Sequence, residues 1–167
     1  MLRGEYWLWP GDLDPSEDKS VVLPNNLIDE GEESFLKMIV RADVSDVAAG
    51  GNFYVGLMGS TFAETTTLAT LAGEPSSAGT YARQAVARNS SGWPTVEQVS
   101  GKFRAVSAQL TFTAVGANFD TAFSRTFLCN VASGSSGLLF SVSSPLTSAL
   151  TVAIGSPLVM QYILYID

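Results

Sequence analysis

The chain has 167 residues, the length of about one domain, and 46% of them are hydrophobic, enough to form a core. The net charge of −7 falls within the first 36 residues, which hold nine acidic and two basic side chains; the remaining residues hold seven of each. With no histidine and one cysteine, the sequence excludes histidine-dependent nucleophilic catalysis, an internal disulfide and a cysteine zinc site.

Residues 1–24 predict an extended arm that lies apart from the rest of the protein. The segment mixes aromatic with acidic residues, and its three prolines interrupt regular helix or strand. Because disordered tails are poor in aromatic residues, we expect the arm to dock on a partner. The expected partner-binding residues are Tyr6, Trp7, Trp9, Asp12, Asp14, Glu17 and Asp18.

One short helix is predicted after the arm. Asp29 and Glu32 form an Asp-x-x-Glu capping pattern, and apolar residues then recur on one helical face as far as Val40. We expect this face to pack on a sheet. Neither the helix nor the longest apolar stretch, residues 157–166, is long enough to span a membrane, so we expect a protein made in a cytoplasm without membrane contact.

From Asn52 onward the sequence predicts antiparallel strands. Short apolar segments alternate with segments rich in Gly, Ser, Thr and Asn, as in sandwiches and barrels. Every second residue is apolar over residues 106–114, which is typical of a strand buried on one face. The other predicted strands span residues 53–58, 79–88, 122–131, 137–142, 150–154 and 158–166. Residues 25–167 therefore form one mainly-β domain.

Two of these strands carry candidate subunit-interface residues. In an extended strand over residues 79–88, Arg83 and Arg88 lie on opposite faces. The sequence leaves open whether they bond within the subunit or reach an acidic partner, such as the arm of a neighbouring chain. Residues 158–166, with Tyr162 and Tyr165, are apolar on both faces, so they form either a central strand or a strand at a subunit interface.

No catalytic set, metal site or cofactor site is expected from the motifs. The remaining possibility for an enzyme is a carboxylate pair that cleaves glycosidic bonds, formed by Glu74 with Glu97 or Asp120. Neither a phosphate-binding glycine loop nor a calcium-loop spacing is present, and no cluster of basic residues favours nucleic acid. We interpret Trp93 as a plug at the end of the core; the alternative is stacking on a sugar ring.

Several short motifs follow one another in a recognisable order: Asn-Leu-Ile-Asp at residues 26–29 in the helix, Asn-Phe-Tyr-Val-Gly-Leu at 52–57, Gly-Thr-Tyr-Ala-Arg-Gln-Ala-Val at 79–86, Gly-Leu-Leu-Phe at 137–140 and Pro-Leu-Thr at 145–147. This order resembles that of small jelly-roll virion proteins of tailed bacteriophages, from about residue 25 to the end. The resemblance implies an antiparallel jelly-roll sandwich, a commonly trimeric structural protein and no catalytic residues. The aromatic and acidic segment before Pro24 has no counterpart in it.

From the resemblance we expect a capsid decoration (cement) protein, a homotrimer that binds across subunits of the major capsid protein. Many weak contacts repeated over a lattice can then stabilise the head. Its expected location is the capsid surface of the virion, after assembly in the host cytoplasm. The alternative expectation is a tail-fibre or receptor-binding component in which Trp93 and serine-rich loops contact host glycans.

Overall fold

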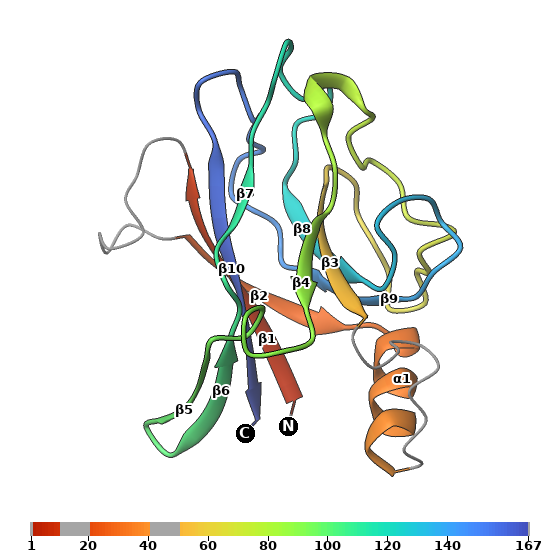
Figure 1. The fold of residues 1–167 in the computed structure, drawn as a ribbon. Coiled ribbons are helices and arrows are strands. Elements are labelled where there is room, and N and C mark those ends of the chain that lie inside the picture. The colour runs from red at the N-terminus through yellow and green to blue at the C-terminus, as the bar shows by residue number, and fades with distance from the viewer. Residues whose placement is uncertain (1, 11–20, 41–50, 167) are drawn as a thin grey trace.

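The computed structural model describes residues 2–10, 21–40 and 51–166, and these residues form a mainly antiparallel β structure with one α-helix (Figure 1). The strands are β1 (Leu2–Pro10), β2 (Val21–Leu27), β3 (Asn52–Met58), β4 (Gln84–Ala87), β5 (Thr95–Val99), β6 (Lys102–Val106), β7 (Leu110–Phe112), β8 (Arg125–Cys129), β9 (Leu139–Ser143) and β10 (Leu158–Ile166). The helix is α1 (Asp29–Val40), and a short 3₁₀ turn, η1, spans Ala78–Thr80. The mainly-β fold predicted from the sequence is confirmed.

All ten strands belong to one sheet that curls on itself. The strand order is β4-β3-β8-β9-β2-β1-β10-β6-β5, and β7 pairs with β10 next to β6. Strand β7 also lies against β4, the strand at one end of this order, so the sheet curls until its two ends approach each other. Backbone hydrogen bonds join them, with the Val115 amide donating to the Gly79 carbonyl at 2.9 Å. The curled sheet therefore encloses a core.

The side chains inside the curled sheet follow the alternation seen in the sequence. Leu110, Phe112 and Ala114 are buried while the threonines between them are exposed, as the period of two predicts. Trp93 packs against this core, with its ring edge-on to Tyr162 at 6.0 Å between centroids. This packing agrees with the interpretation of Trp93 as a plug.

A second, smaller apolar cluster covers the outside of β3, β8 and β9. It contains Ile28, Met58, Leu68, Phe127, Cys129, Leu139 and Val142. Helix α1 lies over β9, where the Glu30 carboxylate accepts a hydrogen bond from the Leu139 amide at 3.1 Å. Gly31 allows this close approach, since a Cβ there would overlap the backbone carbonyl of Phe140. The predicted helix is confirmed from Asp29 onward, whereas Asn26 and Leu27 belong to β2.

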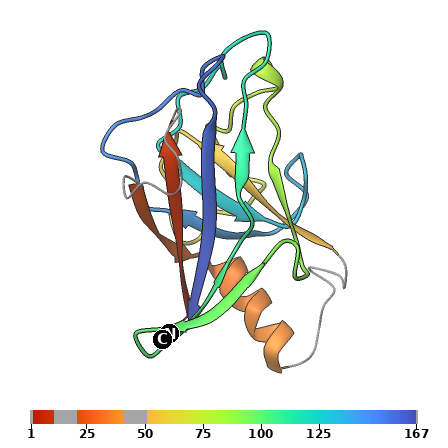
Figure 2. The ribbon, with the colours of Figure 1, turned by 60° about the vertical axis from the view of Figure 1, so that its left-hand side comes forward.

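The expected N-terminal arm is corrected by the position of β1. This strand pairs along its whole length with β10 and, on its other side, with β2 (Figure 2). Tyr6 and Leu8 are fully buried and Trp9 is 3% exposed, because a strand inside a sheet can bury its aromatic residues while both neighbours use its backbone groups. Residues 2–10 and 21–24 thus belong to the body of the protein.

Two further expectations need correction, and one open alternative is resolved. The strand predicted over residues 79–88 is limited to β4, since η1 and an irregular segment precede it. Residues 150–154 form isolated bridges in place of a strand: Leu150 with Phe123, Ile154 with Ala114 and Ala153 with Ser156. Strand β10 lies between β1 and the pair β6 and β7, so the central-strand alternative is the observed one. No helix among the described residues is long and apolar enough to cross a membrane.

Candidate functional site

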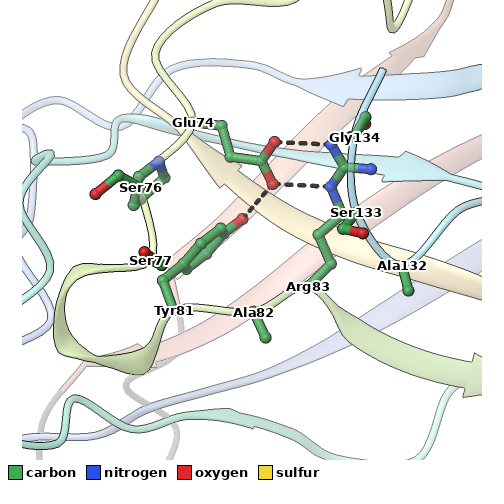
Figure 3. Close-up of a pocket in the computed structure, with 10 residues that line it drawn as sticks. Glu74, Ser76, Ser77, Tyr81, Ala82, Arg83, Ala132, Ser133 and Gly134 are labelled. Carbon is green, nitrogen blue, oxygen red and sulfur yellow. Dashed lines mark hydrogen bonds and ion pairs between the residues drawn. The ribbon is translucent and has the colours of Figure 1, made fainter. Parts of the chain in front are cut away.

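A pocket of about 270 Å³ lies where the segment before β4 meets two loops (Figure 3). It is lined by Glu74, Pro75, Ser76, Ser77, Tyr81, Ala82, Arg83, Ala132, Ser133 and Gly134. The figure shows the Glu74 carboxylate between the Arg83 guanidinium and the Tyr81 hydroxyl. These three side chains form the charged and polar network of the pocket.

The Arg83 guanidinium is buried, with its side chain 4% exposed, and its five N–H donors all have acceptors. Nε and Nη2 bind the two oxygens of Glu74 at 2.8 and 2.7 Å. The other donors reach the carbonyls of Gly134 and Val131 at 2.9 and 3.0 Å and the sulfur of Cys129 at 3.5 Å. The guanidinium thus has no donor left for a ligand.

Tyr81 connects this network to the core. Its hydroxyl donates to Glu74 Oε1 at 2.8 Å and accepts the Leu57 amide at 3.0 Å. Burial, and then the nearby Glu74 charge, raises the pKa of Tyr81 far above its usual value, so the phenol is neutral and remains a donor. Its ring lies between Phe112 and Phe119, and is not free to stack on a ligand.

The network therefore ties parts of the chain together. It links residue 74, the segment just before β4, the end of β3 and the 131–134 loop. Figure 3 shows the links to Glu74 in one view. For Arg83 the question left open by the sequence is answered: it bonds within the subunit, and its interface assignment is corrected. The arrangement can stabilise the fold and position the 131–134 loop.

Cys129 is a free cysteine buried beside the network. Its sulfur accepts a hydrogen bond from Arg83 and donates to the Val131 carbonyl at 3.3 Å. Burial raises the pKa of the Cys129 thiol, so the thiolate needed for nucleophilic attack is disfavoured.

The carboxylates considered for glycosidic cleavage all accept hydrogen bonds from other residues of the chain. Glu74 lies near β4, at one end of the strand order, and Glu97 lies on β5, at the other end. Glu97 accepts a hydrogen bond from Arg104 Nε at 2.8 Å, and Asp120 accepts one from the Ser76 amide at 2.9 Å. Hydrogen bonds from Ser76 lower the pKa of Asp120. No group of three metal-ligating residues occurs in the described part of the chain.

The other aromatic and cationic candidates have contacts within the chain. Tyr162 is buried against Tyr6 and accepts a hydrogen bond from Asn25 at 2.9 Å, so its interface assignment is corrected. Tyr165 is half-buried under the Arg3 guanidinium at 5.0 Å. The Arg88 guanidinium lies 5.9 Å from the ring centre of Phe53.

The aromatic and acidic residues expected in the arm have different positions. Trp9 is buried in the body, which corrects its assignment as a partner-binding residue, as burial does for Tyr6. Trp7 is half-buried, and its indole donates to Glu5 at 3.3 Å. The acidic candidates Asp12, Asp14, Glu17 and Asp18 lie outside the described residues.

The sequence reasoning missed the β5–β6 hairpin as a candidate binding surface. Val96 on β5 is 70% exposed and Phe103 on β6 is 56% exposed. Ser100 and Gly101, which join the strands, have positive φ angles of 51° and 83°, as a two-residue hairpin of this type requires. The signal was the Ser-Gly pair between two segments rich in β-branched and aromatic residues.

Comparisons of the sequence with protein-family models and with curated proteins gave no match.

Proposed function

We propose that this chain is a structural protein of a tailed-bacteriophage virion, a decoration protein on the capsid surface that assembles as a homotrimer and binds across major capsid subunits. The observation that carries the proposal is the β5–β6 hairpin, on which the apolar side chains of Val96, Val99 and Phe103 are exposed. Exposed large apolar side chains grouped on one element mark contact surfaces between proteins. The order of short motifs, from residue 26 to residue 147, supports the virion assignment by resemblance.

The motif at residues 79–86 supports a structural role. The most specific of the motifs, residues 79–86, contains Tyr81 and Arg83, whose contacts all serve the interior of the chain. The residues of this motif therefore stabilise the fold of the chain.

We further propose that the curled antiparallel sheet is a variant of the jelly roll, in which strands distant in sequence, such as β2 and β9, are neighbours.

The proposal predicts saturable binding of the purified protein to phage heads that lack it. Decorated heads should withstand a higher temperature before they release DNA than undecorated heads, because contacts repeated over the lattice add up. Electron microscopy of virions with an antibody against the chain gives its location. Label on the tail, or undecorated heads of equal thermal stability, would contradict the decoration role.

A further inference from the structure

Strand β5 has an edge with which no strand pairs in the described ranges. It is the last strand of the sheet, and its neighbour is β6 alone. Val99 lies opposite Lys102 across the two-residue turn, so every second residue of β5, counted back from Val99, turns its N–H and C=O groups toward β6. Val96 and Gln98 turn theirs away from the sheet. We call this side of β5, with the backbone groups of Val96 and Gln98, the open edge.

One face of the β5–β6 hairpin is apolar. Val96 pairs with Ala105, and Ala105 with Leu164, which packs on the core. Val96, Phe103 and Ala105 therefore lie on the core-facing side of the sheet, and we call them the hairpin face. With Leu164 and Arg104 they line a hollow of about 80 Å³. Figure 1 shows the hairpin extending from the body, so a strand added at the open edge places every second side chain beside this apolar face.

The opposite face of the hairpin carries an incompletely paired carboxylate. Glu97 lies opposite Arg104, and its side chain is 41% exposed. Both hydrogen bonds from Arg104 go to Oε1 of Glu97, so Oε2 accepts none from the described residues. In an antiparallel added strand, the residue opposite Glu97 belongs to a pair without backbone hydrogen bonds, in which side chains come closest. A lysine or arginine at that position would stabilise the pairing, and an acidic residue would oppose it.

Glu97 also argues against a second copy of β5 as the added strand. In the antiparallel register that uses the backbone groups of both Val96 and Gln98, Glu97 of one copy lies opposite Glu97 of the other, and the two carboxylates repel each other. The neighbouring two-fold registers bring either Pro94, which has no N–H group, or the turn residue Ser100 into the ladder. The open edge therefore fits a strand of different sequence better than its own.

We propose that the open edge of β5 receives an antiparallel strand from another protein, in which a lysine or arginine opposite Glu97 stands between two apolar residues. Main-chain hydrogen bonds to Val96 and Gln98 supply the attachment, and the two apolar side chains extend the hairpin face. The inference rests on the decoration role only for the name of that protein, which would then be the major capsid protein. Its test uses no capsid, so failure of either proposal leaves the other to be judged separately.

A tethered strand tests the open edge at high effective concentration. Ile166 pairs with Phe103, so the end of β10 lies beside the hairpin turn, where an antiparallel added strand begins (Figure 2). From there to the added strand is three strand spacings, roughly 14 Å. A Gly-Ser linker of about 12 residues, with a mean reach of roughly 20 Å, can join the C-terminus of the full chain to the segment Thr-Val-Lys-Val-Thr.

Deuterium exchange followed by NMR reads the pairing. The amides of Val96 and Gln98 should exchange about tenfold more slowly with the tethered segment than with the linker alone. A segment with glutamate in place of its lysine should give no protection, and Glu97→Lys should restore protection by that segment. Unchanged exchange at both amides, or equal protection by the lysine and glutamate segments, would overturn the proposal.

Gln98→Pro and Gln98→Thr form a matched pair for the backbone contact. Proline removes an N–H group that points away from β6, so the hairpin ladder remains, whereas threonine keeps this group. Proline should abolish the protection of Val96 and threonine should preserve it, while the amide of Glu97, which faces β6, reports an intact hairpin in both. Native mass spectrometry of the untethered chain should give one oligomeric state for the wild type and both variants. An oligomer that only the proline variant loses would place a second copy on the open edge and overturn the proposal.

Discussion

Arg83 and Arg104 are both paired with a glutamate, yet their surroundings give the two pairs different roles. Arg83 is enclosed and uses every N–H group, while the Arg104 and Glu97 side chains are 23% and 41% exposed. Water screens the exposed pair and competes for its hydrogen bonds. In the enclosed network each unmade bond would leave a buried polar group without a partner. The same pair of residue types is therefore structural in one place and dispensable in the other.

Arg83→Lys should lower the free energy of unfolding by about 2–4 kcal/mol. A lysine ammonium keeps the charge, but it cannot reach Glu74, Val131 and Gly134 at once as the planar guanidinium does. The matched control is Arg104→Lys, for which we expect a loss below about 1 kcal/mol. Urea denaturation followed by circular dichroism measures both. Equal losses in the two variants would show that burial of the Arg83 pair has no energetic effect.

Among the elements, β1 decides whether the N-terminal region is an appendage or part of the core. It fills the place between β2 and β10, and deleting it would remove the neighbour on one side of each of these strands. The hairpin is the opposite case, because β5 has β6 as its single neighbour in the sheet. The importance of a strand thus depends on its position in the sheet.

Removal of residues 1–10 should abolish cooperative unfolding. The deletion exposes the neighbours of Tyr6, Leu8 and Trp9, and burial of each such side chain contributes roughly 2–3 kcal/mol, together comparable with the total stability of a domain. Thermal denaturation and proteolysis provide the measurement. As a control, shortening the hairpin by residues 98–103 should leave a cooperative transition. A deletion variant that unfolds at the same temperature as the full chain would instead support an N-terminal arm that lies apart from the body.

The sequence was sufficient to predict an element where the local residue pattern agrees with the environment of that element in the folded protein. The capping residues Asp29 and Glu32 located α1, and the two apolar faces of residues 158–166 indicated a strand covered on both sides. The β1 strand was missed because acidic residues and prolines nearby suggested an arm, although residues 6–9 form a continuous apolar run of the kind a buried strand has. The bonds of Arg83 depend on loops about 50 residues away, and no local pattern carries that information.

For the whole molecule, the sheet order predicts a gradient of stability from the centre to the hairpin. Amides of β1 and β10 should exchange with deuterium through global unfolding, since both strands have neighbours on each side. Amides of β5 should exchange much faster, because that strand is at the edge. Mass spectrometry of peptic fragments resolves the two classes. Uniform protection over β1, β5 and β10 would contradict the gradient.

The pairing of β1 with β10 also determines how the molecule responds to force. Leu2 lies opposite Ile166 and Pro10 opposite Leu158, so the ends of the two strands emerge side by side. Tension applied at those ends opens the ladder like a zipper, one hydrogen-bonded pair at a time. Tension applied along the strands in opposite directions must break the whole ladder at once. The β1–β10 ladder is therefore mechanically weak when it is pulled apart at Leu2 and Ile166 and resists best when the load runs along the strands in opposite directions.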